Sequence, residues 1–153
     1  MQNKLSLPLD GRSTGLPSSP SAILLVDDDA DMRSLTRTFL EHEGYTVFST
    51  GDAARAAQIF LGAPRIDLLI TDMYMPGRSG LELAFDLKAI RPELPVLVIS
   101  GGFIDDDVKQ RMEHEGWKFV VKPFRFTELL ATIHVMLEAI LAERRRALMD
   151  GVR

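Results

Sequence analysis

Ala22-Ile-Leu-Leu-Val-Asp-Asp-Asp29 is the stretch that decides the fold, because five apolar residues run directly into three acids. A short apolar run of this kind is typical of a strand buried on both faces of a parallel sheet. Three later runs also end at a polar residue: 66–71 before Asp72, 95–99 before Ser100 and 118–121 before Lys122. Since parallel strands share one direction, these polar residues are expected to meet at the edge where open α/β sheets bind ligands.

The segments between these runs have the apolar spacing and end signals of helices. Helices are predicted at about 30–43, 52–61, 80–90, 105–115 and from 126 onward, with a further strand at 45–49. One face of the first helix is expected to be buried through Met32, Leu35, Phe39 and Leu40. Five strands alternating with five helices predict right-handed crossovers and a doubly wound parallel sheet covered on both faces.

Length and composition narrow the class of protein. The chain has 153 residues, 46% of them hydrophobic, and a formal net charge of −4. This predicts one domain and disfavours direct binding of nucleic acid. Cysteine is absent, which excludes disulfides and thiolate metal sites and fits a cytoplasmic protein. No apolar stretch near the start of the sequence resembles a signal peptide or a membrane span.

Three segments are expected along the chain. Residues 1–20 are rich in Ser, Pro and Gly, which predicts a flexible leader. Residues 21–138 form the domain. Residues 139–153 extend the last helix beyond what the fold needs and end in a tail. Ile140, Leu141 and Leu148 should then be partly exposed, either as an ordinary helix end or as a seam for a homodimer or another partner.

The predicted pocket combines acids, a hydroxyl and an ammonium group. Asp27, Asp28 and Asp72 would repel one another by roughly 4 kcal/mol per pair at 4 Å and an effective dielectric of 20. A shared proton or a bound cation can relieve this, and hard oxygen ligands with room for water suit Mg²⁺. Lys122 and Ser100 would bind phosphoryl oxygens, and Asp72 is the best candidate for a nucleophile that forms an aspartyl phosphate. Each residue alone could instead cap a helix or end a strand.

These residues resemble the receiver domain of response regulators in two-component signalling. The similarity covers about 22–137 and rests on four stretches: 23–29, 69–83, 98–101 and 120–124. It implies a flavodoxin-like five-stranded parallel sheet in the order 2-1-3-4-5 with five flanking helices. It also implies a phosphoprotein that binds Mg²⁺ and serves as a phosphoacceptor rather than an enzyme.

The resemblance assigns a role to each matching residue. Asp72 matches the phosphoacceptor and is also expected to bind the metal. Asp28 matches a direct magnesium ligand, Asp27 the acid that acts mostly through water, and the backbone carbonyl of Tyr74 the third protein ligand. Ser100 matches the hydroxyl that follows the phosphoryl group inward, Phe119 the aromatic switch and Lys122 the invariant lysine, whose bond to Pro123 resembles the cis peptide of the family.

The resemblance also implies a signalling role for the whole chain. A histidine kinase or a histidine phosphotransfer protein would phosphorylate Asp72. The face made by the fourth helix, fifth strand and fifth helix, including Val108, Lys109 and Trp117, would then bind a downstream protein, with no direct contact to nucleic acid or membrane. The expected protein is a single-domain response regulator. Tyr74, Gly101-Gly102 and Phe119 depart from the commonest family pattern and are expected to influence the lifetime of the phosphoryl group.

Two other functions stay open at this point. A phosphatase of the haloacid-dehalogenase type has an apolar strand followed by Asp-x-Asp, which Asp27 and Asp29 match superficially. A receiver retained as a scaffold or phosphate sink would keep the pocket without transmitting a signal. Turnover of a phosphate ester would identify the phosphatase. Binding of a partner that depends on phosphorylation would separate a signalling receiver from a phosphate sink.

Overall fold

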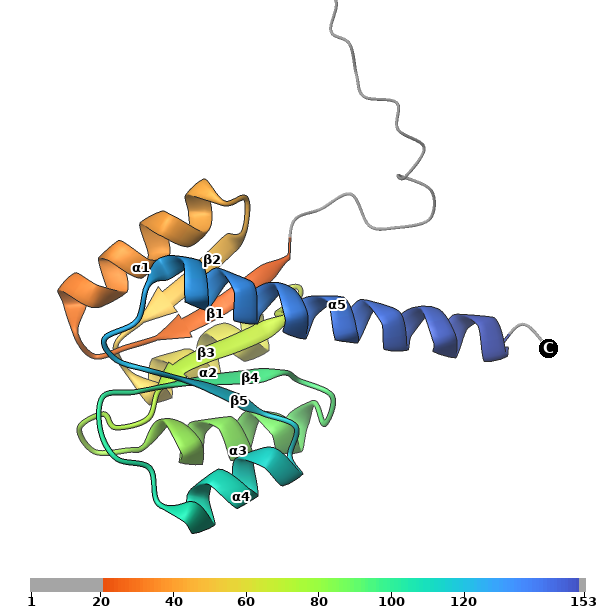
Figure 1. Ribbon diagram of the computed structural model, residues 1–153. Coiled ribbons are helices and arrows are strands. Elements are labelled where there is room, and N and C mark those ends of the chain that lie inside the picture. Colours follow the sequence, from red (N-terminus) through yellow and green to blue (C-terminus); the bar gives the residue numbers. More distant parts are fainter. Residues whose placement is uncertain (1–20, 152–153) are drawn as a thin grey trace, which may run out of the picture.

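The computed structural model describes residues 21–151, and its five strands form one parallel sheet between two layers of helices (Figure 1). The strands are β1 (Ala22–Val26), β2 (Thr46–Thr50), β3 (Leu68–Asp72), β4 (Val96–Ser100) and β5 (Lys118–Val121). The helices are α1 (Ala30–His42), α2 (Ala53–Gly62), α3 (Gly80–Ile90), α4 (Asp106–His114) and α5 (Phe126–Gly151). The strand order β2-β1-β3-β4-β5 confirms the predicted fold class.

Three strands, β2, β3 and β4, end one residue later than predicted. Asp72 is the last residue of β3 and pairs with Ile99, and Ser100 is the last residue of β4 and pairs with Val121. Both polar residues therefore belong to the hydrogen-bonded sheet instead of the loops after it. Their backbone positions are set by the neighbouring strands, which gives the site a rigid base.

Each face of the sheet has its own hydrophobic core. On one face α1 and α5 pack over residues such as Ile23, Leu68 and Leu97 (Figure 1). On the other face α2, α3 and α4 cover Leu24 and Leu69. Successive residues of a strand point to opposite faces, so burial on both sides favours apolar residues all along the strand, as in β1.

The predicted buried face of α1 is wrong at one position. Leu35 is 59% exposed, whereas Thr36 is buried together with Leu40. Residues four apart share a helix face, so Thr36 lies in line with fully buried Leu40, whereas Leu35 lies in line with half-buried Phe39, further toward solvent. Phe39 takes part in the packing as predicted, with its ring 4.8 Å from that of Phe126.

Side chains and glycines mark the helix ends. Asp29 caps α1 by accepting from the amides of Asp31 and Met32, and Ser79 caps α3 in a capping box with Glu82. Gly44, which follows α1, has a φ of 98°, a conformation that favours glycine. Of the three acids after β1, the third therefore serves the helix, which leaves Asp27 and Asp28 for the edge of the sheet.

The ends of the chain add two observations. The predicted leader, 1–20, lies outside the described residues. In α5, Ile140 and Leu141 are half-buried and Leu148 is 71% exposed, as predicted. Within 21–151, no helix combines the length and hydrophobicity needed to cross a bilayer.

Candidate functional site

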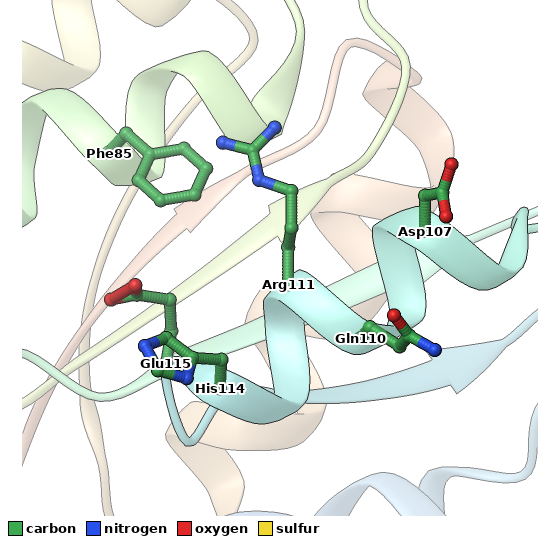
Figure 2. Close-up of a pocket in the computed structure, with 6 residues that line it drawn as sticks. All are labelled: Phe85, Asp107, Gln110, Arg111, His114 and Glu115. Atoms are coloured by element: carbon green, nitrogen blue, oxygen red, sulfur yellow. The ribbon is translucent and has the colours of Figure 1, made fainter.

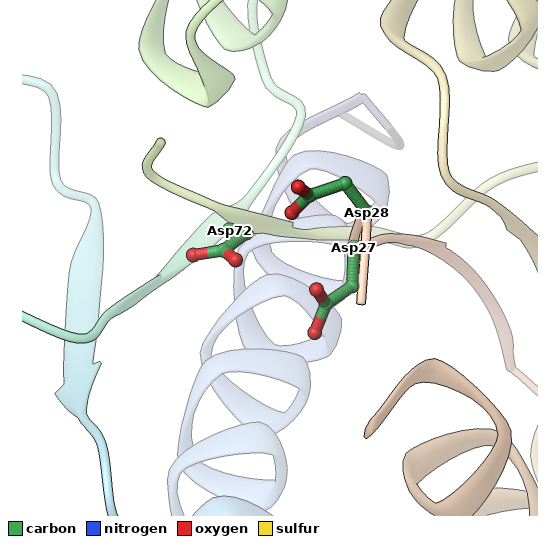
Figure 3. Close-up of side chains that lie close together, drawn as sticks. All are labelled: Asp27, Asp28 and Asp72. Carbon is green, nitrogen blue, oxygen red and sulfur yellow. The ribbon is translucent and has the colours of Figure 1, made fainter. Parts of the chain in front are cut away.

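Three carboxylates converge at the carboxyl ends of β1 and β3 (Figure 3). Asp27 and Asp28 directly follow β1, and Asp72 ends β3, the neighbouring strand. Each offers one oxygen, and these oxygens lie within 4.8 Å of one another. Asp27 and Asp72 are buried, whereas Asp28 is exposed, so the cluster opens to solvent on the side of Asp28.

Lys122 brings a positive charge to this cluster from the end of β5. Its Nζ lies 3.3 Å from Oδ2 of Asp72, close enough for a hydrogen-bonded ion pair. The Lys122-Pro123 peptide is cis, as the resemblance implied. A Cβ added to Gly101 would lie 3.6 Å from Cδ of Lys122, an ordinary contact distance, so Gly101 lies beside the lysine stem. The ammonium group is therefore close enough to contact an oxygen atom of a group that is attached to the Asp72 carboxylate.

The electrostatics of the cluster favour a bound cation. Burial raises the pKa of the Asp27 carboxyl above its usual value; the Asp29 backbone amide and Lys122 oppose this increase, and the charges of Asp72 and Asp28 add to it. The Asp27 carboxyl thus holds its proton more tightly in the folded protein than in the unfolded chain. Its ionisation therefore lowers the free energy of unfolding, and this loss grows as the pH rises through the pKa of Asp27 in the folded protein. A cation at the cluster would offset this cost.

The donor set fits Mg²⁺. Three carboxylate oxygens within 4.8 Å of one another are hard ligands, and the open side at Asp28 leaves room for water and phosphoryl oxygens. Two unit charges at that separation repel by roughly 3 kcal/mol at an effective dielectric of 20. One lysine leaves the group of three acids with net negative charge, so a divalent ion would compensate for it.

Ser100 lies at the tip of β4 but is engaged with its own loop. Its hydroxyl donates to the carbonyl of Gly102 at 3.1 Å and accepts from the Gly102 amide at 3.3 Å. The side chain is fully buried. The structure therefore places Ser100 at the predicted edge, with its hydroxyl turned to the loop that follows.

The remaining predicted positions lie around the pocket. Tyr74, in the loop after β3, is 63% exposed, and Phe119 is half-buried against the core under α2, α3 and α4. Val108 and Lys109 are half-buried on α4.

Trp117 does not belong to the exposed partner face that the sequence predicted. It is only 5% exposed, and its ring packs 4.8 Å from that of Phe85 on α3. Trp117 directly precedes β5, where the chain enters the sheet beneath α3 and α4, so its indole fills the core. A partner on this face would contact Val108 and Lys109 without it.

Three residues around the site were not singled out from the sequence. The hydroxyl of Thr71 donates to the Asp72 carbonyl at 3.0 Å. Gly80 begins α3 and donates its amide to the Met73 carbonyl at 2.9 Å. Arg33 donates to the Asp27 carbonyl at 2.6 Å. Glycine and threonine near a strand end carry little signal by themselves, and an arginine on an amphipathic helix is usually a solvated residue.

A separate cavity of about 520 Å³ lies between α3 and α4, away from the acids (Figure 2). Its lining includes Phe85, Asp107, His114 and Arg111, whose guanidinium lies 4.8 Å from the centre of the Phe85 ring. The cavity is a surface hollow between helices. None of the three acids of the cluster lines it.

Comparison with known proteins agrees with this geometry. The family model described as the response regulator receiver domain matches residues 23–134. The chain is 31% identical over 125 residues to protein PetR of Rhodobacter capsulatus, covering 82% of this chain and 52% of PetR. It is 34% identical over 113 residues to the DNA-binding transcriptional regulator NtrC of Rhizobium meliloti, covering 74% of this chain and 23% of NtrC. The chain thus spans about half or less of these relatives' length.

Solved structures show the same likeness. A CheY-like receiver domain protein of Methanospirillum hungatei superimposes with a TM-score of 0.75 at 25% identity, covering 82% of this chain and 99% of that one. TrrA of Thermotoga maritima, solved in complex with Mg²⁺ and BeF, superimposes with a TM-score of 0.65 at 28% identity, covering 76% and 99% of the two chains.

Proposed function

The chain belongs to the family of response regulator receiver domains, and on that premise we propose that it is a phosphorylation-activated signalling switch with Asp72 as phosphoacceptor. The observation that carries the proposal is the Lys122 ammonium 3.3 Å from the Asp72 carboxylate, at the edge of a cluster of three acids. A structural ion pair alone would not require Asp27 and Asp28 beside it. The combination suits a phosphoryl group that arrives with a divalent cation.

The transfer follows from the positions of these side chains. A carboxylate oxygen of Asp72 attacks the phosphorus of a phosphohistidine, the bond from phosphorus to the imidazole nitrogen breaks, and that nitrogen keeps the electron pair. Lys122 stabilises the negative charge on a phosphoryl oxygen. Asp27, Asp28, Asp72 and the Tyr74 carbonyl would hold Mg²⁺, which when bound neutralises charge as the phosphoryl group approaches.

Activation would rearrange the loop after β4. Ser100 would give up its two hydrogen bonds with Gly102 to donate to a phosphoryl oxygen instead. The movement of this loop would open space into which half-buried Phe119 turns. The face of α4, β5 and α5 that includes Val108 and Lys109 would change shape and bind a downstream protein, so phosphorylation at one end of the sheet alters a surface elsewhere.

The partners we propose follow from this chemistry. A sensor histidine kinase or a histidine phosphotransfer protein donates the phosphoryl group, and the chain works in the cytoplasm as a response regulator. The phosphatase alternative is disfavoured because Asp29, the second acid of its Asp-x-Asp pattern, caps α1 through hydrogen bonds of 3.1 Å to two amides.

The proposal is tested by mixing the protein with acetyl phosphate and following its intact mass. We expect a Mg²⁺-dependent gain of one phosphoryl group that is lost on treatment with hydroxylamine or alkali, as acyl phosphates are. Omitting Mg²⁺ and adding a chelator should remove the gain, because nothing then offsets the repulsion between the acids and the phosphoryl donor. Labelling that is independent of Mg²⁺ would contradict the proposed pocket.

We further propose that α5 forms an antiparallel homodimer. The helix face turned away from the core carries Val135, Glu138, Ala142, Arg145 and Met149, spaced by three and four residues. Val135 is 56% exposed and Met149 72% exposed. With a two-fold axis near Ala142, Val135 lies level with Met149 of the second copy and Glu138 with its Arg145-Arg146 pair. The stripe is therefore complementary to itself in apolar character and in charge.

Charge reversal tests this dimer. Because one helix pair is a small interface, we expect a weak dimer that dissociates on dilution. Glu138→Arg should weaken it, and combining Glu138→Arg with Arg145→Glu and Arg146→Glu should restore it, as measured by sedimentation equilibrium. Glu113→Arg, the same change on exposed α4, is the control and should leave the mass unchanged. A wild-type protein that stays monomeric into the millimolar range would refute the dimer.

A further inference from the structure

Arg33 of α1 contacts the backbone at the base of the acid cluster. Its Nη1 lies 2.6 Å from the carbonyl oxygen of Asp27, to which it donates a hydrogen bond. This carbonyl belongs to the peptide that joins Asp27 to Asp28. A hydrogen bond from a charged donor is among the stronger kinds in proteins. The guanidinium therefore restrains the peptide plane from which the Asp28 side chain leaves.

The space for this guanidinium exists because residue 51 is glycine. A Cβ at Gly51 would lie 2.6 Å from Nη1 of Arg33 and 3.3 Å from the carbonyl oxygen of Asp27. Real Cβ atoms essentially never come as close as 2.6 Å to another atom, so a side chain at position 51 would force the guanidinium to shift from its present position. Gly51 has no positive φ, and its role is to leave room. Arg33 thus fills the gap between the end of β1 and the loop after β2.

Asp28 depends on this restraint more than Asp27 does. The amide of Asp27 donates to the Thr50 carbonyl at 3.1 Å, and its carboxylate accepts from the Asp29 amide at 3.0 Å. The Asp28 side chain is exposed, and within 21–151 no hydrogen bond holds its carboxylate. The direction of the Asp28 side chain is therefore set mainly by the backbone. The Asp27 carbonyl that Arg33 binds is part of the peptide group that precedes Asp28.

We propose that Arg33, with Gly51 leaving room for it, is a positioning residue that holds the Asp28 carboxylate toward the metal site. The inference rests on the proposed function, because it assumes that the acids bind Mg²⁺. Arg33 does not touch the phosphoryl group in this proposal and acts only through the peptide between Asp27 and Asp28. Groups that orient metal ligands in this way typically change affinity about 10–100-fold when removed.

The direct test is Mg²⁺ affinity measured by isothermal titration calorimetry. Arg33→Ala should weaken binding about tenfold. In metal-free protein it should also speed amide hydrogen exchange at residues 28 and 29, a readout that needs no metal. Arg37→Ala is the matched control. It lies one turn further along α1 and loses surface contacts to Glu41 and Ser49, so it should leave Mg²⁺ affinity unchanged.

A double-mutant cycle separates positioning from a general loss of stability. Gly51→Ala should weaken Mg²⁺ binding in the presence of Arg33, since the new methyl group displaces the guanidinium. It should cost less affinity in the Arg33→Ala background, where the guanidinium is gone and only the 3.3 Å contact with the Asp27 carbonyl oxygen remains. Thermal unfolding monitors the fold of each variant. If Arg33→Ala does not fold, the Mg²⁺ affinity of Gly51→Ala tests the proposal instead.

The outcomes distinguish this inference from the proposed function. Absence of Mg²⁺ binding by the wild-type protein would overturn the proposed function and the inference that rests on it. Normal binding by the wild type together with unchanged affinity in both Arg33→Ala and Gly51→Ala would overturn the positioning role alone. Strictly additive effects of the two substitutions would do the same, because independent residues have no shared contact to lose.

Discussion

Asp72→Asn is expected to abolish Mg²⁺-dependent phosphorylation while leaving the fold intact. The amide has nearly the same shape as the carboxylate but is not a nucleophile, so no acyl phosphate forms. Asp72 is 7% exposed and ends β3, so this is a substitution inside the site and not on its rim. Removing one charge from the acid cluster also relieves repulsion, which should offset the lost ion pair with Lys122. Intact mass after incubation with acetyl phosphate measures the result.

The control for Asp72→Asn removes a carboxylate outside the acid cluster, at Asp52, which lines a surface hollow together with Asp28. Asp52 lies in the loop after β2 and caps α2 by accepting from the Ala54 amide at 3.1 Å. Asparagine caps helices about as well as aspartate, so Asp52→Asn should keep normal labelling. Undiminished labelling of Asp72→Asn would reject Asp72 as the acceptor.

Gly80→Ala is expected to destabilise the protein and slow phosphorylation together. A Cβ at Gly80 would overlap the carbonyl oxygen of Asp72 and lie 2.6 Å from the hydroxyl of Thr71. Helix α3 would have to move away from the end of β3, which also moves the backbone of the acceptor. Overpacking against backbone typically costs about 1–3 kcal/mol of unfolding free energy. Urea unfolding and the rate of labelling by acetyl phosphate are the two measurements.

Gly62→Ala is the matched control for Gly80→Ala. Gly62 ends α2, and nothing lies within 4 Å of the position that its Cβ would take. The same substitution should be neutral or slightly stabilising there, since alanine favours a helix. If Gly80→Ala behaved like Gly62→Ala in both measurements, the close approach of α3 to Asp72 would not be needed for the site.

Much of the fold could be predicted from the pattern of apolar runs. All five residues of β1 are apolar, as burial on both faces favours, so β1 is identified by its composition alone. The bounds of β3 and β4 were less accurate because Asp72 and Ser100 look like loop residues, although both belong to the sheet through their pairing with Ile99 and Val121. Hydrogen bonding between strands, and not side-chain polarity, decides where a strand ends.

The errors have a common physical cause. Leu35 was expected to be buried because it is apolar, but Thr36 has the correct angle about the axis of α1. Trp117 was expected on a partner surface because the resemblance places that surface at α4, β5 and α5, but its ring packs against Phe85 of α3. Both outcomes depend on which neighbours surround a residue in space, and hydrophobicity alone does not contain that information.

The sequence by itself determined which chemistry is available: polar residues at the ends of buried parallel strands, with Asp72 and Lys122 among them. The direction shared by parallel strands is sufficient to bring those ends together. Only the tertiary structure decided how they are held. The hydroxyl of Ser100 is bonded to Gly102, α3 approaches Asp72 through Gly80, and Arg33 occupies the space that Gly51 leaves. These contacts join segments whose separation in space depends on how the helices pack on the sheet, and local sequence does not specify that distance.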